Sequence, residues 1–478
     1  MKNFIQNTDW KLLFLYFVLI TFGLLNVYSV SEDLGQKQLI WACISLTVLV
    51  IISISNLIFL EIYSIIFYLI GIFLLLGLFV LGKEINGAKA WYSFGSFSFQ
   101  PAEAVKLFVA LFLSFYAQSK FDYFLSLKNI VISLIIIGIP AVLILFQPDF
   151  GSVIIFSSFL IPLYREGLTG YTFLLILFLS LLFLFSLIYP SAQVMSLLLI
   201  CVSLYILYLF RNSTTRNKDM NYNLYLSYFI GSSLFYVGLF IYSISLKQIP
   251  ESIVIIGTLI NFLGLYLIYS YQNQSEKVNK GKMAQFSSIF SLVILILFIV
   301  SFSSNTIFNQ VLKSHQKERL LVLIEGESKY RDTSGYNLLY AKTAIGSGEL
   351  FGKGYKNGSI TSGKFVPEQQ TDYIFTTVGE EWGFLGSAIL IIVYCLFIGR
   401  IFTLAENQKS RFSRFYGYSI ASIFLLHFAL NISMVMGLFP TVGVPLPYFS
   451  YGGTSFLAFS VMFYIFLKLN YQNNSYLV

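Results

Sequence analysis

Apolar residues run in long, nearly uninterrupted stretches along this chain, and polar residues collect in the segments between them. A helix of about 20 apolar residues crosses the hydrocarbon core of a bilayer, where no water is present to satisfy an open backbone. Stretches of this kind occupy 12–30, 39–54, 57–81, 102–116, 130–146, 150–163, 171–188, 194–210, 224–246, 253–271, 286–302, 384–402, 416–436 and 452–469. The pattern predicts an all-α polytopic membrane protein of about fourteen transmembrane helices.

The composition supports this fold class. The chain is 57% hydrophobic and 11% charged, with a mean hydropathy of +0.77, which excludes an ordinary water-soluble globule. The first apolar stretch follows only Lys2 and Lys11 and has no small-residue cleavage site. We therefore interpret it as a membrane anchor that is retained, and not as a signal peptide.

Lys and Arg are distributed unevenly between the stretches. If the N-terminus lies in the cytoplasm and successive connecting segments alternate between inside and outside, sixteen of the thirty Lys and Arg residues fall on the inside and five in the short outer loops. The other nine lie in one long outer loop within 303–383, which is too long for the positive-inside rule to judge. The count favours this orientation, and it explains the net charge of +8 without a nucleic-acid partner.

Several reaction classes have no support in the sequence. Cys43, Cys201 and Cys395 all fall in apolar stretches without CxxC spacing, which argues against a metal site or a disulfide. The chain has two histidines, His315 and His427, but no GxSxG elbow, so no motif supports a Ser-His-Asp hydrolase. No P-loop or Gly-rich dinucleotide turn occurs, so ATP-driven transport is not indicated.

The conspicuous polar groups fall on the predicted outer side. The stretch TDYIFTTVGEEWG (371–383) carries Asp372, Glu380 and Glu381 directly before an apolar run. Three other outer elements are polar: 86–106, which ends in Gln100, Glu103 and Lys106; the turn 146–152, with Gln147 and Asp149; and 431–455, which contains Ser450. The last is rich in Pro and Gly, which predicts irregular backbone that is buried in protein or lines a wet cavity. We expect one site at the outer leaflet.

The long outer loop has a surplus of cations. Between residues 313 and 364 it contains nine Lys and Arg against five Asp and Glu. Cations, or a bound divalent metal such as Mg²⁺ or Mn²⁺, would steady a leaving diphosphate. A carboxylate nearby would take the proton of an attacking hydroxyl. The combination suits transfer from a phosphate-linked donor, and the sequence specifies no other cofactor.

Six motifs together resemble the SEDS family of bacterial cell-wall polymerases, the RodA and FtsW type. They are NGAKAWYSFGSFSFQPAEAVK (86–106), FQPDFGS (146–152), HQKERLLVL (315–323), GYNLLYAKTAIGSGELFGKG (335–354), FVPEQQTDYIF (365–375) with GEEWG (379–383), and PLPYFSYGGTS (445–455). They occur in the family's order and cover most of the chain except about 190–305. The HQKER stretch resembles the RodA branch more than the division branch.

The resemblance implies a peptidoglycan glycosyltransferase of the bacterial cytoplasmic membrane. Such an enzyme joins lipid II units into glycan strands at the outer face during cell elongation and releases undecaprenyl diphosphate. By similarity, Asp372 is the general base toward the acceptor hydroxyl. We predict a substrate-binding set of Glu103, Lys106, Gln147, Asp149, Lys317, Arg319, Glu368, Glu380, Glu381 and Ser450. The implied partners are a class B penicillin-binding protein, which crosslinks the nascent strand, and other membrane proteins of the elongation complex.

The chain also departs from the family pattern. Gln370 stands where the family usually has His before the Thr-Asp pair, and Ala102 stands within the usual Pro-Ser-Glu. Residues 190–305 add about four apolar segments to a family core of about ten helices. The expected organisation is therefore core helices in 1–189, inserted helices in 190–305, the outer loop in 306–383 and the last core helices in 384–478.

Each candidate residue also has a structural interpretation. Asp372 and Asp149 would both suit the N-terminus of the helix that follows. Glu380 and Glu381 point about 100° apart on a helix, so one of them is structural. Lys106 either reaches the interface or forms a buried pair with Glu103.

Two other function classes stay open. A flippase or transporter of lipid-linked precursors would place its polar groups near the midplane on broken helices. The polar groups here collect at the outer end, which favours the enzyme. An inactive scaffold for a partner synthase is the third alternative.

Overall fold

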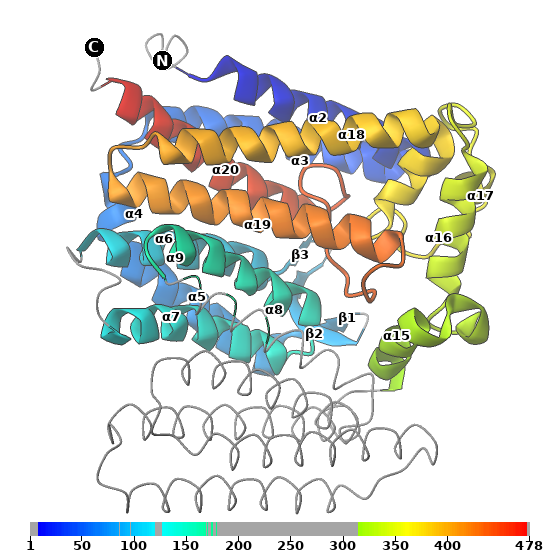
Figure 1. Ribbon diagram of the computed structural model, residues 1–478, viewed down its shortest axis with the longest axis horizontal. Helices are drawn as coiled ribbons and strands as arrows, with labels where there is room; N and C mark the ends of the chain where they lie inside the picture. The colour runs from blue at the N-terminus through cyan, green and yellow to red at the C-terminus, as the bar shows by residue number, and fades with distance from the viewer. Residues whose placement is uncertain are drawn as a thin grey trace, which may run out of the picture. The chain divides into compact units, whose positions relative to one another are not determined.

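The computed structural model describes residues 8–119 apart from 86 and 96, residues 127–168, the single residues 170, 174 and 178, and residues 314–475 (Figure 1). The chain divides into two compact units, Met1–Phe173 with Glu318–Val478, and Leu174–Lys317. Nearly all of the described residues belong to the first unit, and its structure follows.

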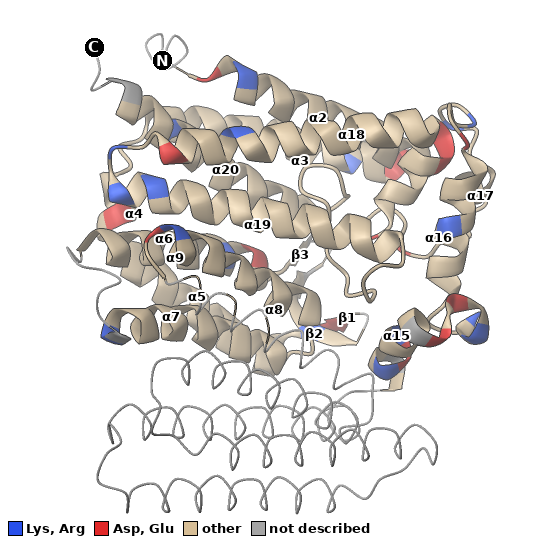
Figure 2. Ribbon diagram, viewed as in Figure 1, with Lys and Arg blue, Asp and Glu red and all other residues tan. Residues whose placement is uncertain are grey.

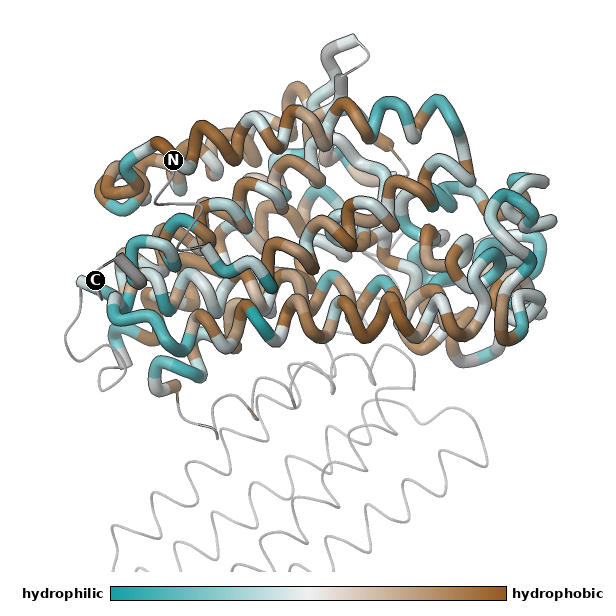
Figure 3. The backbone as a smooth tube through the Cα atoms, turned by 90° about the horizontal axis from the view of Figure 1, so that it is seen from above, coloured by the Kyte–Doolittle hydropathy of each residue, from teal (hydrophilic) through white to brown (hydrophobic). Residues whose placement is uncertain are grey.

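Helices make up most of this unit. The N-terminal part contains α2 (Trp10–Val30), α3 (Glu32–Ile54), α4 (Ile58–Ile62), α5 (Ser64–Leu81), α6 (Pro101–Ser119), α7 (Leu127–Leu145), α8 (Phe150–Phe156), the 3₁₀ turn η1 (Ser157–Phe159) and α9 (Leu160–Arg165). The C-terminal part contains α15 (Ser314–Glu325), the 3₁₀ turn η3 (Glu327–Tyr330), α16 (Tyr336–Ser347), α17 (Ser359–Ser362), α18 (Ile374–Glu406), α19 (Arg411–Val435) and α20 (Gly453–Ser475). Most charged residues lie near the ends of the long helices, and the hydropathy is highest along their middles (Figures 2 and 3).

Eight helices of the described residues are long and apolar enough to cross a membrane: α2, α3, α5, α6, α7, α18, α19 and α20. Each coincides with one of the predicted stretches. The predicted stretch 150–163 is a shorter apolar helix, Phe150–Arg165, with a 3₁₀ turn in its middle. The predicted stretches 194–210, 224–246, 253–271 and 286–302 lie outside the described residues, as does 171–188 except for residues 174 and 178. The helical membrane architecture is confirmed, and the count of fourteen stays a prediction.

A small antiparallel sheet corrects the all-α description. The segment 86–106 was expected to be an outer loop, but β1 (Lys83–Ile85), β2 (Ala88–Phe94) and β3 (Phe97–Phe99) form a three-stranded meander. The Tyr92 hydroxyl in β2 donates to the Leu74 carbonyl of α5 at 2.8 Å, which fixes the meander to the bundle. The segment contains aromatic residues and glycines but few β-branched residues. Its apolar and polar positions do not alternate clearly, so the sequence did not predict strands.

An irregular segment, 437–452, connects α19 to α20 (Figure 1). Val444, Leu446, Tyr448 and Phe449 of this segment are almost fully buried. Gly23 of α2 permits the close approach, because a Cβ there would lie 2.6 Å from the Tyr448 carbonyl oxygen. The prediction of irregular backbone buried in protein is confirmed for these residues.

Helix α18 begins earlier than the apolar run that predicted it. It starts at Ile374 and is interrupted at Gly383, whose φ of 65° and ψ of −161° are not helical. A Cβ at Gly383 would lie 2.3 Å from the Gly352 nitrogen, so the chain after α16 packs directly against the kink. The segment before the kink carries Glu380 and Glu381, and Asp372 lies just before it.

Candidate active site

Asp372 lies in the turn between the exposed residue Glu368 and the start of α18. Its backbone nitrogen donates to the Glu368 carbonyl at 3.1 Å, and its carbonyl accepts from Nδ2 of Asn431 at 2.9 Å. The N-cap residue of α18 is Tyr373, with no side-chain capping bond. Asp372 therefore flanks the N-terminus of α18, as its structural interpretation expected, but it does not cap the helix. Its carboxyl makes no hydrogen bond to any residue in the described part of the chain.

The surroundings of Asp372 favour its protonated form. Asp372 is only partly exposed, and this burial raises the pKa of its carboxyl to about 7. The carboxylates of Glu368 and Asp149 raise the pKa further, whereas the Arg319 guanidinium lowers it. A carboxyl with this pKa and with unused hydrogen-bonding capacity is suited to accept a proton near neutral pH.

The segment 437–452 forms one wall of the site. A Cβ on Gly443, at φ +68°, would lie 3.2 Å from Oδ2 of Asp372. The Arg319 guanidinium of α15 donates to the Thr441 carbonyl at 3.2 Å. On the α8 side, a Cβ on Gly151 would lie 2.5 Å from the Val442 carbonyl oxygen. The wall therefore connects α15, α8 and Asp372.

Asp149 and Gln147 hold the framework beside this wall. Asp149 caps α8: its carboxylate accepts from the Ser152 nitrogen at 3.1 Å, the Ser152 hydroxyl at 2.8 Å and Nε2 of Gln100 at 2.9 Å. Gln147 is buried and donates to the Leu75 carbonyl at 3.0 Å. The N-cap interpretation of Asp149 is confirmed, and its charge still acts on Asp372.

Glu103 and Lys106 form a buried ion pair on α6. The Nζ–Oε1 distance is 2.7 Å, and the Lys106 side chain has no exposed surface, so the interpretation in which it reaches the interface is wrong. Lys106 Nζ also lies 2.8 Å from Nε2 of His427. His427 and Asn431 were not predicted as site residues. Their spacing of four on α19 places them on one helix face, and that was the one signal available.

Glu380 and Glu381 face different partners, as their adjacency predicted. The Glu380 carboxylate is fully buried and accepts from Lys353 Nζ at 2.8 Å, from the Ile360 and Thr361 nitrogens at 2.9 Å each and from the Thr361 hydroxyl at 2.8 Å. Glu381 accepts from the Ser29 hydroxyl of α2. Both side chains support the fold of the outer segment.

Ser450 and Lys317 complete the predicted set. The Ser450 hydroxyl accepts from the Leu446 nitrogen at 2.8 Å and is buried, so it shapes the wall segment. Lys317, in the first turn of α15, is the last residue of the second unit. Of the predicted residues, the structure gathers Glu368, Arg319 and Asp149 around Asp372. The substrate-binding role of each residue stays a prediction.

Comparisons with known proteins identify the family of this chain. The family model of FtsW, RodA and SpoVE, described as cell cycle protein, matches residues 10–199 and 281–475. The chain belongs to this family. The RodA peptidoglycan glycosyltransferase of Treponema pallidum is 26% identical over 94% of each chain. The MrdB peptidoglycan glycosyltransferase of Escherichia coli K12 is 24% identical over 97% of this chain and 94% of its own.

Solved structures show the same fold. A chain from a peptidoglycan synthase complex, described for its coordination of polymerization and crosslinking, superimposes with a TM-score of 0.60 at 19% identity, over 98% of both chains. The Thermus thermophilus rod shape determining protein RodA gives 0.51 at 17% identity, over 98% of this chain and 97% of its own. With eight apolar helices and this FtsW/RodA/SpoVE membership, the chain is a multi-pass membrane protein.

The family model also bears on the middle of the chain. It leaves residues 200–280 unmatched, inside the predicted insertion 190–305. The bounds of that insertion and the four expected regions stay predictions.

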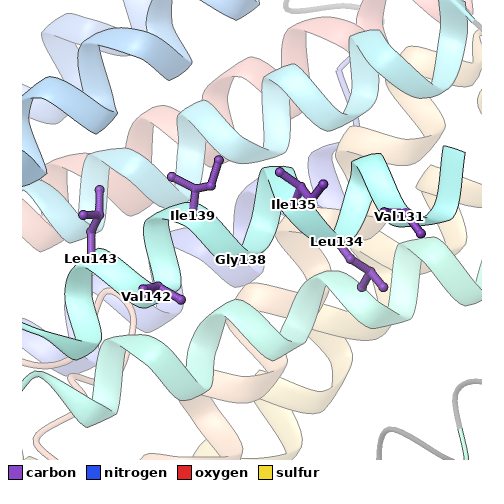
Figure 4. Close-up of a pocket in the computed structure, with 7 residues that line it drawn as sticks. All are labelled: Val131, Leu134, Ile135, Gly138, Ile139, Val142 and Leu143. Atoms are coloured by element: carbon purple, nitrogen blue, oxygen red, sulfur yellow. The ribbon is translucent and has the colours of Figure 1, made fainter. Parts of the chain in front are cut away.

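The described residues hold no metal cluster, and the hollow along α7 offers no second site for chemistry. Among the described residues, no three His, Cys, Asp or Glu side chains gather closely enough to hold a metal ion. The use of Mg²⁺ or Mn²⁺ stays a prediction. The hollow along α7 is lined by Val131, Leu134, Ile135, Gly138, Ile139, Val142 and Leu143 (Figure 4). Its lining has no ionisable group and cannot transfer a proton.

Proposed function

We propose that this protein is a peptidoglycan glycosyltransferase that polymerises lipid II at the outer face of the bacterial cytoplasmic membrane during cell elongation. Membership in the FtsW/RodA/SpoVE family supports this function, as do the relatives named RodA and MrdB. The observation that carries the proposal is the carboxyl of Asp372, which is partly open, makes no hydrogen bond to a described residue and has a pKa of about 7.

In the proposed reaction, the acceptor sugar hydroxyl loses its proton to Asp372 as its oxygen bonds to the anomeric carbon of the donor. The bond between that carbon and the diphosphate breaks, and undecaprenyl diphosphate leaves with the electron pair. Arg319 lies close enough to Asp372 to lower its pKa, so it keeps a share of the carboxyl ionised at neutral pH. The same guanidinium is suited to pair with a phosphate oxygen.

The topology and the partner belong to the same proposal. The N-terminus lies in the cytoplasm, because that orientation places most Lys and Arg inside. We expect a class B penicillin-binding protein as partner, together with other membrane proteins of the elongation complex. The similarity to a chain of a synthase complex that coordinates polymerization and crosslinking supports a crosslinking partner.

The test is polymerisation of lipid II by the full chain with its partner synthase, followed on a gel. Wild type is expected to form glycan polymer, and Asp372→Asn is expected to form none while remaining folded. Asp33→Asn, the same change at an exposed carboxyl of α3, is the matched control and should polymerise normally. If neither wild type nor control forms polymer but both move lipid II across liposomes, the protein is a flippase and the proposed function is wrong.

A further inference from the structure

We propose that Asn431 is a positioning residue for the reaction, because its side-chain amide ties the backbone of Asp372 to the wall segment 437–452. This inference rests on the proposed function and deepens it. Nδ2 of Asn431 donates to the Asp372 carbonyl at 2.9 Å and to the Val444 carbonyl at 2.7 Å. Carbonyl oxygens only accept, so the nitrogen of the amide must be the atom that faces both of them.

The cost of this arrangement indicates a specific use. Asn431 is completely buried, and its Oδ1 has no hydrogen-bond partner among the described residues. A buried polar atom without a partner is rare in native structures and destabilises the fold. A leucine would fill nearly the same space without that cost. The two hydrogen bonds that only the amide provides are therefore the feature that distinguishes this residue.

The two hydrogen bonds of Asn431 determine the space around the carboxyl of Asp372. Val444 follows Gly443 directly, and the Gly443 backbone approaches Asp372 so closely that an added Cβ would lie 3.2 Å from Oδ2. One helical turn earlier on α19, Nδ1 of His427 lies 3.0 Å from the Pro445 carbonyl oxygen. The two side chains thus hold consecutive residues of the wall on one helix, and Asn431 alone also holds Asp372.

The charges that act on Asp372 come from three elements. Glu368 lies in its own turn, Asp149 at the N-terminus of α8, and Arg319 on α15. Burial is the largest influence, and the wall contributes to it because the Gly443 backbone lies next to Oδ2 of Asp372. Release of the wall would admit water, stabilise the ionised form and move the pKa of Asp372 down. It would also let the base drift from the acceptor hydroxyl.

The experiment compares wild type with Asn431→Leu and Asn431→Ser in lipid II polymerisation, as a function of substrate concentration and pH. Asn431→Leu keeps the volume and removes both donors, and we expect a loss of about 10- to 100-fold in kcat with KM little changed. The acidic limb of the rate profile should move to lower pH. Asn431→Ser keeps one donor, should be affected less, and decides the question if the Leu variant does not fold.

The matched control is Ser422→Ala on the same helix. The Ser422 hydroxyl is buried but donates only to the Tyr418 carbonyl of its own helix, at 2.6 Å. We expect wild-type kcat and an unchanged pH profile. If folded Asn431→Leu polymerises with wild-type kcat and pH profile, the positioning role is wrong while the proposed function stands.

A second measurement separates the inference from the proposed function. Carbodiimide labelling of Asp372 against pH, followed by mass spectrometry, reports the ionisation of the carboxyl without any turnover. The pH at which labelling of Asp372 is half complete should be lower in Asn431→Leu than in wild type and unchanged in Ser422→Ala. If wild type makes no polymer, the proposed function is wrong. Independently of that result, an unchanged labelling midpoint in Asn431→Leu would show that Asn431 does not position Asp372.

Discussion

The ammonium of Lys106 lies 2.8 Å from Nε2 of His427, deep between α6 and α19. An ammonium has only donors, so Nε2 is the acceptor and the ring proton must be on Nδ1. That nitrogen lies 3.0 Å from the Pro445 carbonyl oxygen, to which it donates. One neutral histidine therefore joins the buried Glu103–Lys106 pair to the wall of the site.

Loss of the cation from this pair should destabilise the protein strongly. Lys106→Met leaves the Glu103 carboxylate buried without a counter-charge, and we expect a cost of about 3–5 kcal/mol. The double variant Glu103→Leu with Lys106→Met removes both charges and should recover much of that stability. Thermal unfolding of the purified protein in detergent measures both. A double variant no more stable than Lys106→Met would show that the carboxylate is not the source of the loss.

The helices were predictable because membrane-spanning length leaves a clear mark in composition. The nine predicted stretches that fall on described residues all proved to be apolar helices. The family motif around Asp372 was also recognisable. The apolar run did not mark the start of α18, because Ile374–Trp382 packs on the outer segment through Gly348 and Gly352, and such packing has no signature in a single sequence.

The roles of polar residues were harder to predict than their locations. Glu380 and Asp372 lie on the same short stretch. The Glu380 carboxylate accepts several hydrogen bonds, whereas the Asp372 carboxyl accepts none in the described part of the chain. The donors of Glu380 are Lys353 and residues of α17, about 20 or more positions earlier, and only the fold brings them there. Asn431 was missed for the same reason, since its partners are backbone carbonyls, and His427 was missed because only the fold brings Lys106 of α6 beside its ring.

Glu380 and Glu381 should respond differently to the same substitution. Glu380→Gln replaces an acceptor oxygen with an NH₂ group among the Ile360 and Thr361 N–H donors and weakens the pair with Lys353. We expect a cost of about 1.5–3 kcal/mol and faster proteolysis of residues 353–366. Glu381→Gln should have a smaller effect, because Oε2 of Glu381 has no partner among the described residues. Equal sensitivity of the two variants would contradict this assignment.

The rate of polymerisation should rise with pH through about 7. The base must be ionised to act, and burial raises the pKa of Asp372 to about 7. Arg319 lowers that pKa, so Arg319→Gln should move the acidic limb of kcat to higher pH and reduce the rate at pH 7. A rate profile of both proteins against pH checks this. A limb that stays in place in Arg319→Gln would mean that this guanidinium does not act on the base.

Asp372 should also make the folded protein less stable in mild alkali. In the folded state its pKa is about 7, against about 3.9 in an unfolded chain. Between these values the native carboxyl holds a proton that the unfolded one has lost, so stability falls as pH rises from about 4 to 7. Asp372→Asn does not titrate and should exceed wild type at pH 8 by up to about 4 kcal/mol.

This gain should shrink toward pH 5, where the native Asp372 is protonated. Unfolding temperatures of the two proteins at pH 5 and pH 8 measure the difference. Asp33→Asn, at an exposed position, should show no such pH-dependent gain. A gain in Asp372→Asn that is the same at both pH values would point to a cause other than ionisation.

Gly443→Ala should stop polymerisation with only a moderate loss of stability. The residue has a φ of +68°, which costs an alanine about 1–2 kcal/mol, and its new methyl group would lie 3.2 Å from Oδ2 of Asp372. The methyl would occupy space beside the carboxyl that the acceptor hydroxyl needs. Gly399→Ala is the control, because a Cβ at that position in α18 meets no atom within 4 Å. It should keep wild-type activity, since alanine is the better helix former. If Gly443→Ala folds and polymerises as well as Gly399→Ala does, the acceptor approaches Asp372 from another side.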